Sequence, residues 1–290
     1  MRVLVAGWFS FDEVIATVGD ELGADVVVGW LTEEGIAHDV AWAPYLGRGV
    51  DWRDVDPADY THLVFVSGPI SDTQLLRELT GTFAAAQRWA VNVSVVSPAG
   101  RAMFDRVWER DAPELARPDL AVATTTGDLP VVAVAFAPAQ EEYGERSQAD
   151  RVRSAIEEWL ATRALPWFEV TMDLFEKPHP RHPAQVEALI RRADVVVSMR
   201  LHALVLGLAH GVPVVACDAV VGGAKVTAQA GALGWPLLLG AEDVTAAALD
   251  DALGQALSGR LAAEVTAAQE RGRQGNERAR TWFSEALRSG

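Results

Sequence analysis

The residues of this chain with the clearest chemical potential are Arg200 and His202, which lie with Leu201 between two apolar runs. The run over residues 193–199 is typical of a buried strand, and the run over 203–210 is typical of a buried helix. Charged side chains at such a junction are costly to bury unless they meet a partner. A guanidinium and an imidazole beside the free N–H groups of a helix favour an anion. The sequence therefore predicts an anion-binding site here.

The spacing of these residues predicts how their side chains lie. In an extended segment, residues two apart project to the same side, so Arg200 and His202 face one way and Leu201 faces the core. An anion site requires that both side chains face the groove between domains and have no carboxylate that already neutralises them. The alternative is that they only cap and solvate an exposed loop.

A second basic segment, VVGGAKV, follows the next predicted strand. Gly222 and Gly223 allow a close approach of the backbone, and Lys225 supplies another cation. Because the carboxyl ends of parallel strands meet at the same edge of a sheet, we expect these residues to lie near Arg200. A simple turn is the alternative.

Composition restricts the possible partners. The formal net charge is −15, which argues against nucleic acid or an anionic membrane surface as a partner. No apolar run reaches the ~18–20 residues of a transmembrane helix, so we expect no membrane span. The only cysteine, Cys217, cannot form an internal disulfide and follows an apolar strand, which favours a buried thiol and a cytoplasmic location.

Two segments bear on cofactor and metal binding. The segment after the first strand, residues 7–21, has no G-x-G-x-x-G pattern, so we expect no dinucleotide cofactor. Two histidines lie in KPHPRHP, residues 177–183, but its prolines predict an extended turn without further ligands. We therefore expect no metal site.

The elements that must position these residues alternate between strands and helices. In the first half we predict helices over 19–34 and 72–86, the latter with Asp72 as its N-cap, and strands over 1–7, 38–43, 61–68 and 89–96. After a break near 125–130, we predict helices over 150–160, 184–192 and 203–210, and strands over 129–137, 167–173, 193–199 and 212–219.

This alternation predicts an α/β protein with two Rossmann-like domains, whose parallel sheets face each other across a cleft. The boundaries that we expect are residues 1–127 for the first domain and residues 128–290 for the second. The chain after 241 reads as mostly helical, and helices within 243–290 could pack back across both domains.

The string DVVVSMRLHALVLGLAHGVPVVA, followed by GGAKV and LGWP, resembles the C-terminal signature of the polysaccharide pyruvyl transferase family. The resemblance is strongest over 193–236. Members of that family have two Rossmann-like domains in a GT-B-like arrangement. They transfer the enolpyruvyl part of phosphoenolpyruvate to sugar hydroxyls and so form a ketal. The resemblance implies a transferase of cell-envelope polysaccharide biosynthesis that binds its donor at Arg200, Leu201 and His202.

Two segments depart from the family pattern. Many members have an arginine soon after the first strand of the second domain, where this chain reads VAFAPAQ, and Arg146 is the nearest candidate replacement. The usual glycine- and asparagine-rich loop after the first strand is here GWFSFDEVIATVGDE, which keeps only Gly19 and Asp20.

Phosphoenolpyruvate brings a carboxylate and a phosphate, which favours two separate arginine contacts. We expect Arg200 and Arg146 to hold these groups, with Lys225 as an assisting charge and Gly222 and Gly223 shaping the same site. The acceptor hydroxyl attacks C2 while C3 gains a proton, so the reaction needs a general acid. Histidine titrates near neutrality and suits this step, and we expect His202 to be that acid.

The first domain is the expected acceptor side. Asp12, Glu13 and Asp20 lie in the loop after the first strand and are candidates for the base that accepts the hydroxyl proton. Asp20 could instead be the N-cap of its helix. Ser67 and Gly68, after the strand at 61–66, are expected to line the cleft.

Two other functions stay open from the sequence alone. A GT-B-type glycosyltransferase with a nucleotide-sugar donor would also use two Rossmann-like domains and cations for a diphosphate. A degenerate, non-catalytic member would bind an anionic metabolite or a partner protein. The sequence determines neither the sugar or glycan that accepts the pyruvyl group nor the oligomeric state.

Overall fold

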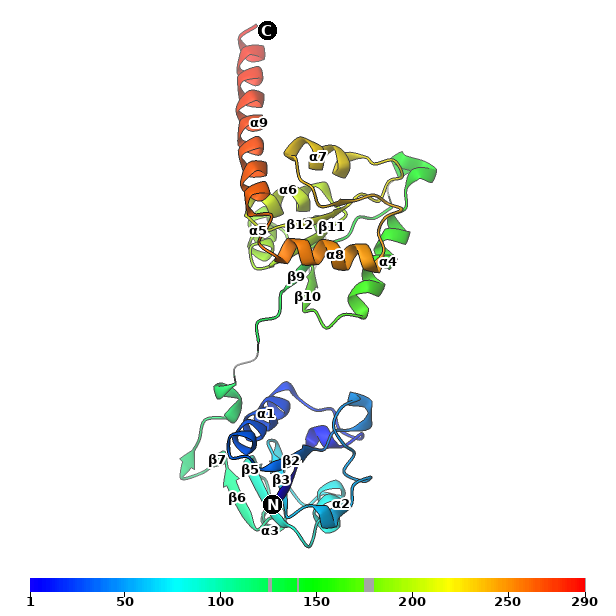
Figure 1. The fold of residues 1–290 in the computed structure, drawn as a ribbon. Coiled ribbons are helices and arrows are strands. Elements are labelled where there is room, and N and C mark those ends of the chain that lie inside the picture. Colours follow the sequence, from blue (N-terminus) through cyan, green and yellow to red (C-terminus); the bar gives the residue numbers. More distant parts are fainter. Residues whose placement is uncertain (125–126, 140, 175–179, 290) are drawn as a thin grey trace. The chain divides into compact units, whose positions relative to one another are not determined.

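The computed structural model describes residues 1–124, 127–139, 141–174 and 180–289. The chain divides into two compact units, Met1–Gly127 and Asp128–Gly290 (Figure 1). Each unit is a parallel sheet with helices packed against it, so the predicted α/β class with two Rossmann-like domains is confirmed. The expected facing of the two sheets across a cleft stays a prediction.

The sheet of the first unit has the strand order β2-β1-β3-β5-β4, with β6 paired to β5, and all of these pairs are parallel. Its strands are β1 (Arg2–Gly7), β2 (Ala37–Val40), β3 (His62–Val66), β4 (Pro69–Ile70), β5 (Gln87–Val95) and β6 (Arg106–Glu109). A separate antiparallel pair contains β7 (Asp111–Ala112) and β8 (Leu115–Ala116).

The helices of the first unit are α1 (Val18–Glu33), α2 (Gln74–Thr82) and α3 (Pro98–Ala102), with short 3₁₀ turns η1 (Trp8–Ser10), η2 (Pro44–Leu46), η3 (Pro57–Asp59) and η4 (Leu120–Ala123). Asp72 was predicted to cap the second helix, and this is wrong. The hydroxyl of Thr73 accepts from the N–H of Leu76 instead, and Asp72 pairs with Arg77 at 3.2 Å. Asp and Thr are both favourable N-cap residues. Because α2 begins at Gln74, the N-cap position falls on Thr73.

The strands at the centre of this sheet are buried on both faces. Leu4 and Ala6 of β1 pack into a cluster with Leu76 and Leu79 of α2, whereas Val3 and Val5 pack into a cluster with Val27 of α1. Successive side chains of a strand point to opposite faces, so helices on both faces require the continuous apolar run seen in the sequence.

The second unit contains a five-stranded parallel sheet in the order β10-β9-β11-β12-β13. Its strands are β9 (Val132–Ala135), β10 (Trp167–Glu169), β11 (Val195–Ser198), β12 (Val214–Cys217) and β13 (Leu238–Leu239). Its helices are η5 (Glu141–Arg146), α4 (Ala149–Ala161), α5 (Pro183–Ile190), α6 (Leu201–Ala209), α7 (Lys225–Leu233), α8 (Ala246–Leu257) and α9 (Ala262–Ser289).

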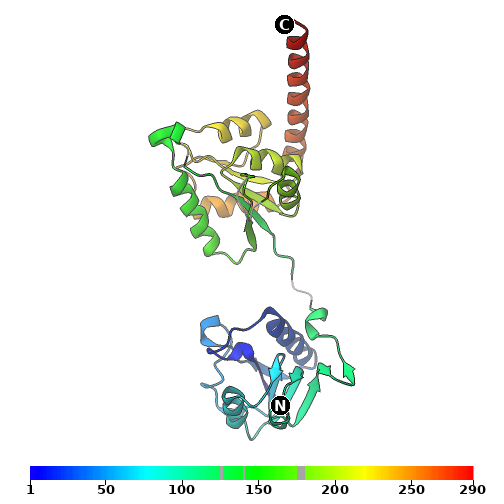
Figure 2. The ribbon, with the colours of Figure 1, turned by 180° about the vertical axis from the view of Figure 1, so that it is seen from behind.

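The last helix, α9, has two parts with different surroundings. Near its start, Val265 and Ala268 are buried, and the helix contacts α6 and α7. Its later part extends away from the rest of the second unit (Figures 1 and 2). Trp282, Phe283 and Leu287 in this part are exposed. No helix in the described part of the chain is both long and apolar enough to cross a membrane.

Candidate functional site

The predicted donor residues of the second unit lie after the carboxyl ends of three strands. Arg146 comes after β9, Arg200 and His202 come after β11, and Lys225 comes after β12. The strand order reverses at β9, because β10 lies on one side of it and β11 on the other. Ligands of open parallel sheets bind outside the carboxyl ends at such a reversal. Ala137 after β9, Met199 after β11, and Asp218 and Lys225 after β12 line one small cavity at this edge.

Arg200 is the N-cap of α6 and has extended backbone angles. Its backbone N–H donates to the Ser198 hydroxyl at 2.9 Å, and that hydroxyl donates to the Arg200 carbonyl at 2.8 Å. The prediction that residues 200–202 form one extended segment is wrong, because α6 begins at Leu201. Leu201 is therefore half-buried, and His202 lies exposed on the first helical turn, in a direction that the two-residue spacing does not predict.

The expectation that Arg200 has no carboxylate partner is also wrong. Its Nη2 donates to Oδ1 of Asp173, a residue that follows β10. The Arg200 side chain is 16% exposed and the Asp173 side chain 45% exposed. Because β9 lies between β10 and β11, the ion pair spans the carboxyl end of β9, where a ligand would bind. The pair uses one guanidinium nitrogen, so the remaining N–H groups can still donate.

Arg146 is brought to the glycine-containing loop that follows β12. Its Nε donates to the carbonyl of Val221 at 3.1 Å, and its Nη2 donates to the carbonyl of Gly223 at 3.0 Å. Its own carbonyl accepts from the N–H of Val221 at 2.9 Å. The structure thus joins Arg146, Gly222, Gly223 and Lys225, which are far apart in sequence, into one group.

Three cationic or titratable groups of this edge stay without an acidic partner in the described residues. No carboxylate lies within 4.0 Å of the side-chain nitrogens of Arg146, His202 or Lys225 there. No described side chain caps the N-terminus of α6, so its first N–H groups stay free. These groups can bind an anion, and the exposed imidazole can exchange a proton.

Asp218 was not identified from the sequence. It is 1% exposed and lies directly after β12, where its carboxylate accepts from the backbone N–H groups of Val220, Ala224 and Thr227 and from the hydroxyl of Thr227. The sequence signal was an aspartate at the end of a buried strand, before a glycine pair, which is typical of a residue that organises a turn.

The first unit places Ser67 and Gly68 after β3, at the reversal between β1 and β3. Both have left-handed backbone angles, with φ of 64° for Ser67 and 72° for Gly68. The Ser67 hydroxyl is buried and accepts from Nδ2 of Asn92 at 3.1 Å. The expectation that Ser67 lines an open cleft is therefore wrong for its side chain, whereas Gly68 is half-buried beneath Trp8.

The three carboxylates proposed for the acceptor side have different surroundings. Asp20 is nearly buried and forms a capping box with Thr17, which is the N-cap of α1. The alternative that Asp20 is the N-cap is wrong, although its role is still structural. Glu13 is exposed and pairs with Arg53 at 3.3 Å, and Asp12 is exposed.

Cys217 and His182 have structural surroundings in the described part of the chain. Cys217 is fully buried, and this burial raises the pKa of its thiol to about 12, as expected for an unreactive core residue. Nδ1 of His182 accepts from the N–H of Ala184 at 3.2 Å and so caps α5. Residues 177–179 of the histidine-containing segment lie outside the described residues.

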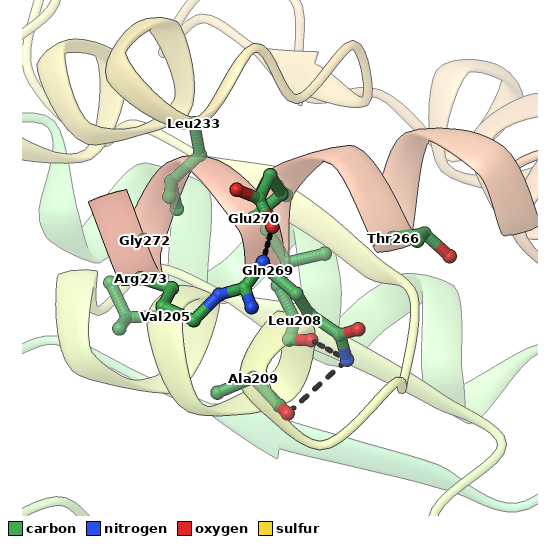
Figure 3. A pocket seen from close by; sticks show the side chains of 10 residues that line it. Val205, Leu208, Ala209, Leu233, Thr266, Gln269, Glu270, Gly272 and Arg273 are labelled. Atoms are coloured by element: carbon green, nitrogen blue, oxygen red, sulfur yellow. Dashed lines mark hydrogen bonds and ion pairs between the residues drawn. The ribbon is translucent and has the colours of Figure 1, made fainter. Parts of the chain in front are cut away.

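A larger cavity, of about 520 Å³, lies between α6, α7 and α9 (Figure 3). Its lining is mostly apolar, and the amide of Gln269 inside it donates to the carbonyls of Leu208 and Ala209. Its charged side chains, Glu270 and Arg273, pair with each other. None of the predicted site residues lines this cavity. The candidate site therefore stays at the carboxyl ends of β9, β11 and β12, where those residues lie.

Residues 118–219 match the family model described as polysaccharide pyruvyl transferase. This segment includes β9 to β12 and the Arg-Leu-His sequence at the start of α6. The resemblance predicted from the sequence is thus confirmed over these residues. Comparison with curated proteins finds no match.

Solved structures similar to this chain include the following three, each at low sequence identity and low TM-score. CalG4, the calicheamicin glycosyltransferase, is 12% identical with a TM-score of 0.35 and covers 99% of this chain and 97% of its own. An alpha,alpha-trehalose-phosphate synthase (UDP-forming) from Burkholderia vietnamiensis is 14% identical with a TM-score of 0.35, covering 79% and 69%. The UDP-GlcNAc 2-epimerase from Methanocaldococcus jannaschii is 9% identical with a TM-score of 0.34, covering 90% and 94%.

Proposed function

We propose that this protein transfers the pyruvyl group of phosphoenolpyruvate to hydroxyls of a sugar or glycan and forms a ketal. The observation that supports this most is the family match over residues 118–219, which includes the Arg200, Leu201 and His202 sequence at a ligand-binding edge of the second sheet. The donor would bind where β9, β11 and β12 end. This location agrees with the chemistry of a small anion beside helix N-termini.

The charges at this edge suit the two ends of the donor. Arg200 and the N–H groups at the start of α6 would bind one anionic group, and Arg146 with Lys225 would bind the other. The pair of Arg200 with Asp173 does not meet the requirement set from the sequence, and it lowers the positive charge that this edge offers to a donor. A multiply charged ligand can compete with Asp173 or share the guanidinium.

His202 would supply the proton. In the first step, an acceptor hydroxyl forms a bond to C2 of the donor while imidazolium protonates C3, so the carbon–carbon double bond becomes single. In the second step, another acceptor hydroxyl replaces phosphate at C2 and closes the ketal. Inorganic phosphate leaves, and the two hydroxyl protons pass to bases and water. Asp12 and Glu13 are the acceptor-side carboxylates that are exposed, so they suit the base better than Asp20.

The direct test combines donor binding with turnover. We expect phosphoenolpyruvate to raise the melting temperature of the full chain, since stabilisation grows as RT ln(1 + [L]/Kd). We expect His202→Gln to abolish ketal formation while this thermal shift persists, because the imidazole acts on the proton and not on the anions. The loss should be at least ~10²-fold.

The control is His38→Gln, which changes a half-buried histidine of the first unit and should leave turnover unaltered. Stabilisation by UDP- or GDP-sugars and not by phosphoenolpyruvate would contradict the proposal and favour a glycosyltransferase. Stabilisation by none of these ligands would favour a non-catalytic protein.

A further inference from the structure

Asp218 is a buried carboxylate that the proposed chemistry does not use. It follows β12 directly, at the same edge of the sheet as Arg200. Its side chain is 1% exposed, yet it makes no ion pair within the described residues. A charge buried in this way requires several hydrogen bonds to offset the loss of water.

All of these hydrogen bonds come from the ten residues that begin with Asp218 itself. Oδ1 accepts from the N–H of Val220 at 3.1 Å. Oδ2 accepts from the N–H of Ala224 at 2.7 Å, and from the N–H and the hydroxyl of Thr227 at 2.8 and 2.7 Å. The carboxylate therefore closes the turn between β12 and α7 and fixes where α7 begins.

The turn closed by Asp218 also determines the place of Arg146. Gly222 and Gly223 have φ of 76° and 79°, angles that direct the chain back toward the loop before α4. The carbonyls of Val221 and Gly223 then accept from the Arg146 guanidinium at 3.1 and 3.0 Å. A shift of the turn would move both acceptors and release the arginine.

We propose that Asp218 is a positioning residue of the donor site, which holds Arg146 and Lys225 in place through the 219–224 turn. This inference rests on the proposed function, since it assigns the two cations to the donor. Lys225 is the first residue of α7, two residues before Thr227, so the carboxylate fixes its backbone as well. The role of Asp218 is indirect, because its oxygens are occupied by the turn.

Charge and position predict opposite effects of removing this carboxylate. A negative charge near an anion site opposes anion binding, so by charge alone Asp218→Asn would strengthen donor binding. Asparagine, however, keeps one acceptor oxygen and replaces the other by an NH₂ group, whose hydrogens would face at least one of the present N–H donors and loosen the turn. A positioning role therefore predicts weaker donor binding.

The experiment compares the full chain with Asp218→Asn and with Thr227→Val, a variant of similar shape that removes one bond without changing charge. We expect Asp218→Asn to raise KM for phosphoenolpyruvate at least ~10-fold, with a much smaller change in kcat. We expect hydrogen exchange of the 219–227 amides to accelerate, and Thr227→Val to show both effects more weakly. The matched control is Asp194→Asn, which changes a carboxylate that accepts from the N–H of Val131 at the opposite edge of the sheet.

An unchanged or lowered KM in Asp218→Asn, with the turn amides as protected as before, would overturn the inference. If Asp218→Asn does not fold, an unaltered KM and unaltered exchange in Thr227→Val would overturn it equally. Inorganic phosphate separates this inference from the proposed function. Phosphate binding that Asp218→Asn weakens would support the positioning role even if no pyruvyl transfer occurs. Failure of the wild type to bind either anion would overturn both.

Discussion

The environment of Arg200 shows how one contact changes the electrostatics of the candidate site. The sequence predicts an unpaired guanidinium, but its Nη2 meets the carboxylate of Asp173 across the end of β9. The site is therefore less positive than expected, and the groups that remain to bind an anion are the cations Arg146 and Lys225 and the free N–H groups of α6. For the proposed donor, Asp173 would be a competitor for Arg200, in contrast to Asp218, which is buried and accepts from backbone N–H groups and the Thr227 hydroxyl.

Removal of the Asp173 charge should strengthen binding of the donor, and Asp173→Asn in the full chain tests this. The change removes one negative charge beside Arg200, so phosphoenolpyruvate should bind more tightly, by up to about fivefold, as expected for a half-exposed pair. Calorimetric titration measures the Kd. Glu157→Gln is the control, because Glu157 is similarly exposed and pairs with Arg153 on α4. Weaker donor binding in Asp173→Asn would mean that Asp173 orients Arg200 and does not compete with the donor.

At the scale of elements, the site depends on how closely α6 packs on β12. Gly207 of α6 lies so near this strand that a Cβ there would be 2.5 Å from Cγ2 of Val214. Val214 is fully buried and cannot move aside without disturbing its neighbours. The glycine thus allows the close approach that holds the N-terminus of α6, with Arg200 and His202, against the sheet.

A pair of glycine-to-alanine variants tests this packing. We expect Gly207→Ala to lower the free energy of unfolding of the second unit by about 1–3 kcal/mol through overpacking. We expect Gly254→Ala, in α8, to raise it by about 0.5–1 kcal/mol, since no atom lies within 4 Å of the new Cβ and alanine favours a helix. Urea unfolding measures both values. An unchanged or raised free energy of unfolding in Gly207→Ala would contradict the close approach of α6.

At the scale of the whole molecule, the proposed donor residues and the proposed acceptor-side residues belong to different compact units. Arg146, Arg200, His202, Asp218 and Lys225 all lie in the unit Asp128–Gly290. Asp12, Glu13, Asp20, Ser67 and Gly68 lie in Met1–Gly127. Each unit has its own sheet and its own hydrophobic core, which is the condition for folding alone.

This division predicts the behaviour of the separate units. We expect residues 128–290, produced alone, to unfold in one cooperative transition and to bind phosphoenolpyruvate with an affinity like that of the full chain, but without turnover. Residues 1–127 should fold and bind no donor. Melting curves of both fragments with and without the donor measure this. A folded 128–290 fragment that does not bind a donor bound by the full chain would show that the first unit contributes to donor binding.

Several features of this fold and site could be predicted from local sequence patterns. Short continuous apolar runs predicted β1, β3, β9, β11 and β12, because strands buried on both faces need continuous apolar sequence. The same logic predicted that Arg200, Leu201 and His202 follow a strand end at the edge where ligands bind. Short strands such as β13, and helix α7 after the glycine pair, were not predicted, since their few residues have no clear period.

The sequence by itself determined the alternation of buried strands and helices, and with it the edge of the sheet at which the polar residues gather. Only the tertiary structure decided their partners. Asp173 and Arg200 are 27 positions apart, and Arg146 reaches carbonyls 75 and 77 positions away, so no local pattern contains these contacts. Strand order brings them together, and strand order follows from how the whole sheet packs.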